Sequence, residues 1–361
     1  MRYFFIVGEA SGDIHAAEFM KRIQVSDPDA QFMGLGGDKM QEQGAQLFQH
    51  YKNMAFMGVI AVLRNARKIK ENFRIAEEAL LREQPDQLIL VDYPSFNLKM
   101  AQFARMHIPN IKIVYYIPPK VWAWKTHRIH KIARLCDEVL AIFPFEPAFY
   151  AKFGCHCTYV GNPTAEAIKN YRSQRTNHQS FDSVALVPGS RRGEISNCLP
   201  KMLVAAREAK AKGQIKDIIV TAAPNIEDAF YAKYLQSDER LSRDTWAVVS
   251  HAKAAIVTSG TASLEVALLG CPQFAVYRIY TSHWLGWLEP FIFKIRLYTL
   301  PNIIAGKPII YEAVGPKFKN HIIRRELQRL LTDDAYVQQM QADYQHLRDI
   351  LANTDKHTLF K

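Results

Sequence analysis

The fold of this chain is decided by residues 87–106, which read QLILVDYPSFNLKMAQFARM. After Gln87 the run is continuously apolar to Val91, which is typical of a strand buried on both faces of a parallel sheet. A short turn follows, and residues 98–106 carry a helical pattern. A strand that turns directly into a helix is one step of a βαβ unit, so the stretch predicts a parallel α/β sheet.

The same alternation extends from this stretch in both directions. Strands are expected at residues 3–7, 32–36, 111–116 and 138–142, with helices at 14–23, capped by Asp13, and at 66–84. It resumes with strands at 183–187, 217–221, 247–250, 254–258 and 273–277 and helices at 199–211, 226–235 and 262–269.

A polar stretch, residues 165–182, separates these two runs and is expected to be a linker. The sequence therefore predicts an α/β protein with two Rossmann-like domains whose parallel sheets face a central cleft. The expected boundaries are 1–164 for the N-terminal domain, 183–340 for the C-terminal domain and 341–361 for a helical tail.

Composition narrows the class of protein. The chain has 361 residues, 48% of them apolar, which suits two folded domains and excludes a disordered chain or a small disulfide scaffold. Lys and Arg number 46 against 35 Asp and Glu, and the net charge of +11 favours nucleic acid, an anionic membrane surface or phosphorylated substrates. No leader peptide, membrane-spanning helix or metal-binding motif is expected from the pattern.

Two loops in the first half follow predicted strands and carry polar groups. The first loop contains Glu9, Ser11, Gly12 and Asp13, and it fits either a ligand approaching a helix N-terminus or a tight turn capped by Asp13. Asp92 ends the 87–91 strand, where a carboxylate is either a general base or a cap for the following helix.

Two loops in the second half suit an anion. Gly189 and Ser190 offer backbone N–H groups, and Arg191 offers a planar fork that fits phosphate. The alternative for Arg191 is a position on a solvated face. Ser259, Gly260 and Thr261 open an apolar helix, and Glu265 stands one turn into it, where its carboxylate can take both hydroxyls of a ribose. A Ser/Thr-capped helix with an acid near its positive end explains the second loop equally well.

Residues 59–74 predict a basic amphipathic helix. Its apolar arc includes Val59, Val62 and Leu63, and its basic side includes Arg64, Arg67 and Lys68. Such a helix either lies on an anionic bilayer or covers the protein core with a solvated back. Trp122 and Trp124 lie in a second basic stretch, where they suit stacking on a sugar or burial in an interface.

The motifs of this chain resemble those of the lipid A disaccharide synthases, which are GT-B glycosyltransferases. They occur in the same order along the chain as in that family. The matching motifs within residues 3–310 are Gly8–Asp13, Met57-Gly58, 91–97 (VDYPSFN), 119–124 (PKVWAW), 143–146 (FPFE), 160–163 (VGNP), 186–191 (LVPGSR) with Glu194, 258–265 (TSGTASLE) and 300–306 (LPNIIAG). The chain has Ala61, Ser95 and Asn162 where many family members carry Glu, Asp and His.

The resemblance implies the reaction. The family transfers 2,3-diacylglucosamine from UDP to the 6-hydroxyl of 2,3-diacylglucosamine 1-phosphate (lipid X), which gives the β-1,6-linked disaccharide 1-phosphate and UDP. The transfer inverts the anomeric carbon and needs no metal or other cofactor. The resemblance also implies that the protein attaches to the anionic inner membrane from the cytoplasm of a Gram-negative bacterium and has no nucleic-acid partner. The C-terminal helices of the family can be exchanged between the protomers of a dimer, and the sequence leaves open whether this chain forms a homodimer.

The resemblance also implies roles for the residues named above. Asp92 is expected to be the base, and Arg191 is expected to stabilise the departing diphosphate. The expected donor side comprises Gly189, Ser190, Glu194, Ser259, Gly260, Thr261, Glu265 (for the ribose) and Asn302. The expected acceptor side comprises Glu9, Ser11, Gly12, Asp13, Trp122 and Trp124.

Two rival functions remain. One is another GT-B enzyme acting on UDP-GlcNAc, either a glycosyltransferase or a 2-epimerase, which the first-half loops argue against. The other is a basic nucleic-acid-binding protein, which would need a basic stripe with a recognisable binding module, and the sequence contains none.

Overall fold

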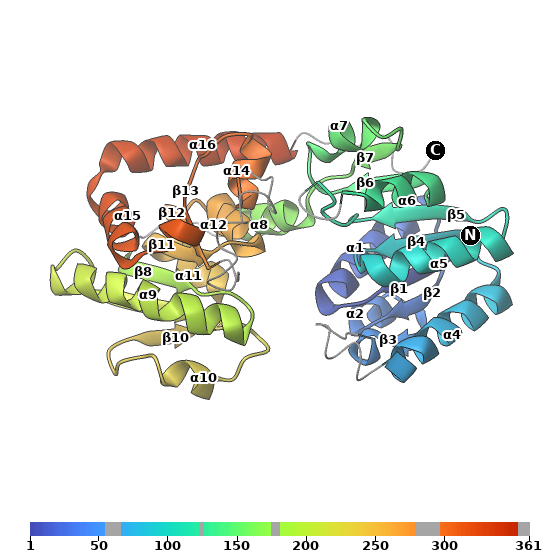
Figure 1. Ribbon diagram of the computed structural model, residues 1–361, viewed down its shortest axis with the longest axis horizontal. Coiled ribbons are helices and arrows are strands. Elements are labelled where there is room, and N and C mark those ends of the chain that lie inside the picture. The colour runs from blue at the N-terminus through green and yellow to red at the C-terminus, as the bar shows by residue number, and fades with distance from the viewer. Residues whose placement is uncertain (55–65, 123–125, 175–180, 279–296, 353–361) are drawn as a thin grey trace. The chain divides into compact units, whose positions relative to one another are not determined.

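The computed structural model describes residues 1–54, 66–122, 126–174, 181–278 and 297–352 (Figure 1). Its contacts divide the chain into two compact units, Met1–Gly161 and Asn162–Asn353. Each unit is built on one sheet of parallel strands, which confirms the prediction of two Rossmann-like halves.

The first unit contains a seven-stranded sheet in the order β3-β2-β1-β4-β5-β6-β7 (Figure 1). Its strands are β1 (Arg2–Val7), β2 (Gln31–Gly36), β3 (Gln46–His50), β4 (Gln87–Val91), β5 (Lys112–Tyr116), β6 (Glu138–Ala141) and β7 (Cys157–Tyr159). Because β1 pairs with both β2 and β4, the strand order reverses between β1 and β4. Ligands of open α/β sheets bind beyond the carboxyl ends of the strands at such a reversal.

Helices cover both faces of this sheet, as the side-chain alternation of β1 requires. Phe4 and Ile6 point into one core, which contains residues of α4 (Ala66–Glu83), α5 (Pro94–His107) and α6 (Arg128–Leu135). Tyr3, Phe5 and Val7 point into the other core with α1 (Ala10–Ser26) and α2 (Asp38–Glu42). The remaining short helices are η1 (Tyr51–Asn53) and α7 (Glu146–Ala151).

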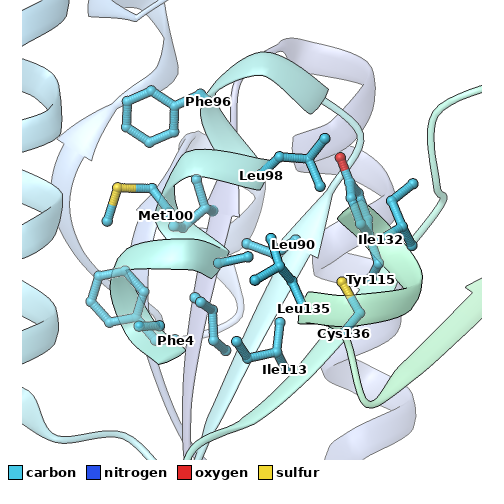
Figure 2. Packing of buried hydrophobic residues seen from close by; sticks show 14 of the residues in the cluster. Phe4, Leu90, Phe96, Leu98, Met100, Ile113, Tyr115, Ile132, Leu135 and Cys136 are labelled. Atoms are coloured by element: carbon cyan, nitrogen blue, oxygen red, sulfur yellow. The ribbon is translucent and has the colours of Figure 1, made fainter. Parts of the chain in front are cut away.

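The first of these cores places Tyr115 next to the sheet's carboxyl edge. Figure 2 shows Leu90 and Ile113 of the central strands among side chains of α5 and α6, with Tyr115 nearby. Tyr115 is fully buried, and its hydroxyl donates a 2.7 Å hydrogen bond to the carbonyl of Asp92. The packing of the core is therefore linked directly to the loop that follows β4.

The second unit contains a six-stranded parallel sheet in the order β10-β9-β8-β11-β12-β13. Its strands are β8 (Phe181–Val187), β9 (Asp217–Thr221), β10 (Arg240–Ser242), β11 (Ala252–Thr258), β12 (Gln273–Tyr277) and β13 (Tyr311–Val314). The order reverses between β8 and β11, since β8 pairs with both β9 and β11.

Helices also cover this second sheet. They are α8 (Pro163–Ser173), α9 (Arg192–Ala211), α10 (Asp228–Ala232), α11 (Thr245–His251), α12 (Thr261–Leu269), α14 (Leu300–Ala305), η3 (Gly315–Lys317), α15 (Asn320–Thr332) and α16 (Asp334–Ala352). Ala185 and Val257 of the sheet share a core with Val249 of α11 and Val266 of α12. The helices α9 and α15 pack on each other and on the same sheet.

Three expected elements differ in the structure. Residues 247–250, expected as a strand, belong to helix α11, because Asp244 caps its start by accepting a 2.9 Å hydrogen bond from the backbone N–H of Ala247. Part of the expected linker is helix α8, which Asn162 caps and which buries Ile168. The helical tail expected from residue 341 begins earlier, as α16 at Asp334.

Candidate active site

The strand reversal of the first unit brings Glu9 and Asp92 to the same edge of the sheet. Val7 of β1 pairs with Val91 of β4, so the loops that follow these strands start side by side. Gly8 is required here, because a Cβ atom at this position would lie 2.3 Å from the ring of Tyr93. The absence of that atom lets Tyr93 pack over the first loop and keeps the two carboxylates close.

The backbone of Asp92 is held in an uncommon conformation. Its φ is 43°, in the left-handed region that costs most residues about 1 kcal/mol, although Asp tolerates it better than most. Its N–H donates to the carbonyl of Ile117 at 3.2 Å, and its carbonyl accepts from Asn97 Nδ2 at 2.7 Å as well as from Tyr115. These bonds fix the direction of the Asp92 side chain at the end of β4.

The surroundings of Asp92 make it a stronger base than an ordinary aspartate. Burial, with a further contribution from the negative charge of Glu9, raises the pKa of Asp92 to about 6, while Lys120 acts in the opposite direction. At pH 7 the group is still mainly ionised, and a base whose pKa lies near the working pH transfers protons efficiently. The geometry therefore gives Asp92 the properties that a general base needs.

Glu146 is a buried acid near this edge that was absent from the expected site residues. Its side chain is 1% exposed and accepts 3.1 Å hydrogen bonds from Trp122 Nε1 and from the backbone N–H of Phe143. Burial raises the pKa of Glu146 to about 7, and the hydrogen bonds and the charge of Lys120 oppose that rise. The FPFE motif was the sequence signal that could have identified it.

Glu146→Gln tests this burial through the pH dependence of stability. The pKa of Glu146 is raised on folding, so wild-type stability is expected to fall as pH rises from about 4.5 to about 7. Gln does not titrate, so the stability of the variant relative to wild type should improve by about 2.5 kcal/mol between pH 5 and pH 8. Urea unfolding at both pH values measures this, with the exposed Glu42→Gln as the control; an equal difference at both pH values would contradict it.

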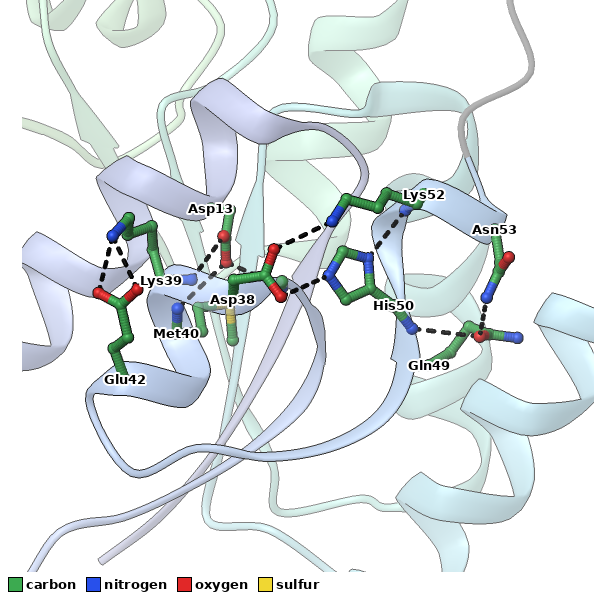
Figure 3. Close-up of polar contacts among 10 residues, drawn as sticks. Asp13, Asp38, Lys39, Met40, Glu42, Gln49, His50, Lys52 and Asn53 are labelled. Carbon is green, nitrogen blue, oxygen red and sulfur yellow. Dashed lines mark hydrogen bonds and ion pairs between the residues drawn. The ribbon is translucent and has the colours of Figure 1, made fainter.

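Asp13 does not cap α1, contrary to the expectation from the sequence, because that helix begins earlier, at Ala10. Its carboxylate bonds to backbone groups of another helix. It is 2% exposed, and its carboxylate accepts backbone hydrogen bonds from Gly37, Lys39 and Met40 at 2.8, 2.9 and 3.2 Å. Figure 3 shows this carboxylate at the start of α2, beside the exposed pair that Asp38 forms with His50 and Lys52. Asp13 therefore caps α2 from a distant part of the chain.

Asp13→Ala is expected to lower the free energy of unfolding of the first unit by about 3 kcal/mol, because three N–H groups lose a charged acceptor. Asp13→Asn should cost less, since Oδ1 alone accepts from both Gly37 and Met40. Urea unfolding measures both changes. A loss below about 1 kcal/mol for the alanine variant would show that the cap contributes little.

The other expected acceptor-side residues lie at or near the same edge. Ser11 is exposed and donates a 2.7 Å hydrogen bond to Glu9, and Gly12 packs against Val7 where α1 begins. Trp122 is half-buried and packs edge-on against Phe143 and Phe145. Trp124 lies outside the described residues.

In the second unit, the turn after β8 is closed by Glu194. Its carboxylate accepts from the backbone N–H of Ser190 at 3.2 Å and from Arg191 Nη1 at 2.8 Å. Gly189 has a φ of 102°, and a Cβ atom there would lie 2.7 Å from Glu194 Oε2, so only glycine fits. Arg191 keeps 67% of its side chain exposed, at the N-terminus of the 20-residue helix α9. The turn thus presents a cation and a helix N-terminus, a combination that attracts anions.

The neighbouring turn follows β11. Val187 of β8 pairs with Val257 of β11, so this turn and the previous one lie at the same edge of the sheet. Gly260 and Thr261 are exposed at the N-terminus of α12, and Ser259 Oγ donates to the carbonyl of Tyr298 at 3.3 Å. Further along α12, Glu265 accepts a 2.9 Å hydrogen bond from Trp246 Nε1, which orients its carboxylate.

Asn302, the remaining residue expected on the donor side, is fully buried. Its amide donates to the carbonyl of Ile310 and to Glu312, and its oxygen accepts from the backbone N–H groups of Ile309 and Ile310, all at 2.8–2.9 Å. Two donors and two acceptor positions are then in use, which is the capacity of an amide side chain. The structure therefore gives Asn302 the role of joining α14 to β13.

The described part of helix α4 faces the protein core with its apolar side. Phe73 stacks on Phe96 with ring centroids 4.2 Å apart, while Arg67 and Lys68 are exposed. Val59, Val62, Leu63 and Arg64 lie outside the described residues. None of the described helices is long and apolar enough to cross a bilayer, and no group of three potential metal ligands occurs in that part of the chain.

Comparison with known families gives a match over nearly the whole chain. Residues 3–358 match the family described as Lipid-A-disaccharide synthetase. The lipid-A-disaccharide synthase of Trichlorobacter lovleyi is 34% identical over 360 residues, which cover 97% of this chain and 93% of that protein. The synthase of Geobacter sulfurreducens is 32% identical over 351 residues, which cover 94% and 90%.

Solved structures share the fold at low sequence identity. The UDP-GlcNAc 2-epimerase from Neisseria meningitidis, bound to UDP-GlcNAc, has a TM-score of 0.63 at 12% identity and covers 98% of both chains. A UGT transferase from Siraitia grosvenorii in complex with UDP has a TM-score of 0.59 at 11% identity and covers 99% of this chain and 97% of its own. These likenesses place the chain in the GT-B fold shared by glycosyltransferases and epimerases.

Proposed function

The chain belongs to the lipid-A-disaccharide synthetase family, and from that premise we propose that it joins UDP-2,3-diacylglucosamine to lipid X with inversion at the anomeric carbon. The products are the β-1,6-linked disaccharide 1-phosphate and UDP. The observation that carries this proposal is the placement of Asp92 beside Glu9 at the strand reversal of the first unit, with the pKa of Asp92 raised to about 6.

Asp92 acts as the general base in this proposal. Its carboxylate takes the proton from the 6-hydroxyl of lipid X as the oxygen attacks the anomeric carbon of the donor. Glu9 stands close enough to strengthen that base, and Ser11 holds Glu9 by a 2.7 Å hydrogen bond. The first unit therefore binds the acceptor, and Trp122 offers an apolar surface beside it.

The second unit binds the donor. As the bond between sugar and diphosphate breaks, negative charge grows on the leaving phosphate, and Arg191 with the N-termini of α9 and α12 stabilises it. Arg191 exchanges its exposed contact with Glu194 for the phosphate. Glu265, oriented by Trp246, takes the ribose hydroxyls. The positive charge of Arg191 and of the two helix N-termini lets the transfer proceed with no metal ion.

The stereochemistry of the product tests the mechanism. Incubation of the protein with both lipid substrates in detergent micelles, followed by proton NMR of the purified disaccharide, should show the large H1–H2 coupling of a β-linkage. An α-linked product would exclude direct attack by the activated hydroxyl.

We propose that the enzyme acts at the membrane surface, because both of its substrates carry acyl chains. The exposed Arg67 and Lys68 of α4 belong to the basic side that we propose faces anionic lipid. Each such cation contributes about 1 kcal/mol near an anionic surface. Arg67→Glu combined with Lys68→Glu should therefore weaken binding to vesicles with anionic lipid at least tenfold in a sedimentation assay. The control is Lys212→Glu combined with Lys216→Glu in the second unit, and equal weakening by both pairs would show that only net charge matters.

A further inference from the structure

The second unit contains a cavity that lies away from the proposed donor turns. Its volume is about 430 Å³, within the range of small-molecule sites. It opens at the amino edge of the sheet, where β11 begins at Ala252 and the chain enters β12 after Pro272. The donor turns follow the carboxyl ends of the strands, so the two sites lie at opposite edges of one sheet.

Three cations from three elements line this cavity. They are Arg172 of α8, Lys253 of β11 and Arg348 of α16, and the residues that line the cavity include no carboxylate. Burial lowers the pKa of Arg348, and the like charge of Arg172 lowers it further, while Asp349 acts in the opposite direction. The two guanidinium groups are therefore close enough to repel each other.

The fold uses only part of this positive charge. Arg172 Nη1 and Arg348 Nη1 both donate to the carbonyl of Leu268, at 3.2 and 3.5 Å, and so neutralise the C-terminus of α12. A helix C-terminus carries about half a negative charge, which is much less than the three positive charges present. Within the described residues, the ammonium group of Lys253 has no hydrogen-bond or ion-pair partner. An unneutralised positive charge remains in the cavity.

From this arrangement we propose that the cavity between α8, β11, α12 and α16 is a binding site for a small phosphomonoester. A dianionic phosphate matches the charge of two guanidinium forks and one ammonium group better than a single carboxylate does. The body of the ligand would rest on the apolar wall formed by Val249, Leu269 and Val337. The site is separate from the catalytic turns, and the proposal does not depend on the proposed reaction.

Inorganic phosphate is the probe for this site. The full chain is first saturated with UDP, which occupies the proposed diphosphate turns, and its Tm is then followed as phosphate replaces chloride at constant ionic strength. Phosphate at ten times its Kd is expected to raise the Tm of wild type by about 3 °C. Lys253→Ala and Arg348→Gln should each lose at least half of that rise, and the matched control Lys216→Ala should keep it.

Each outcome of this experiment either supports or overturns the proposed phosphate site. The proposal is overturned if wild type shows no phosphate-dependent rise, or if Lys253→Ala keeps the full rise. Arg348 also contacts Gln345 and Leu268, so its variant could unfold. Lys253 makes no such contact, and its variant then decides the question alone.

Discussion

Asp92→Asn is expected to lower kcat by about 10³-fold while the protein stays folded. The substitution keeps the size of the side chain and the hydrogen bonds from Asn97 and Tyr115 to the backbone carbonyl. It removes the carboxylate, which in the proposed mechanism takes the proton from the 6-hydroxyl of lipid X. General bases contribute about 10²- to 10⁴-fold. Steady-state release of UDP measures the change, and Asp29→Asn, an exposed aspartate before β2, is the matched control.

The pH profile adds a test that a structural defect would not reproduce. Since the pKa of Asp92 in the free protein is about 6, the wild-type kcat/KM should fall as pH drops through that value and Asp92 becomes protonated. Glu9→Gln removes a negative charge that raises this pKa, so the acidic limb should move to lower pH. An unchanged limb in Glu9→Gln, or a normal rate in Asp92→Asn, would remove Asp92 from the mechanism.

Arg191→Ala is expected to lower kcat by about 10²- to 10³-fold, the usual loss when one group that stabilises a developing negative charge is removed. The side chain is 67% exposed, and its ion pair with Glu194 is of the surface kind that adds little to stability. Folding should therefore be unaffected, which circular dichroism checks.

The neighbouring Arg192→Ala is the control for this variant. Arg192 is also exposed at the start of α9, but it pairs with Glu227 and stacks on Phe230, away from Glu194. Its removal should change kcat less than threefold, and Arg191→Lys should recover part of the lost rate. Equal losses in Arg191→Ala and Arg192→Ala would point to general electrostatics in place of a specific phosphate contact.

The sequence predicted the central strands of both sheets because each is an apolar run with a clear turn beside it. It also placed Asp92 and Arg191 correctly at strand ends, since parallel strands expose the residues that follow them. The strand predicted at residues 247–250 was wrong. The β-branched Val248 and Val249 favour a strand, but Asp244 caps a helix that contains these residues. Local propensity could not decide between them.

The roles of Asp13 and Asn302 could not be predicted for a different reason. Both are polar residues in motifs, and their chemistry suits a ligand as well as it suits the backbone. Their partners, the N–H groups at the start of α2 and those of Ile309 and Ile310, become neighbours only in the folded chain. Glu146 is the converse case, because its near-complete burial, which gives its carboxyl an unusual pKa, is a property of the tertiary structure alone.

Release of UDP from UDP-2,3-diacylglucosamine in detergent micelles with EDTA, with and without lipid X, tests the proposed reaction and its independence of metal in one experiment. We expect rapid release that depends on lipid X and is unaffected by EDTA. Release without any acceptor, or activity on UDP-GlcNAc alone, would contradict the assigned substrates. Loss of activity in EDTA that is restored by a divalent cation would contradict the role given to Arg191 and the two helix N-termini.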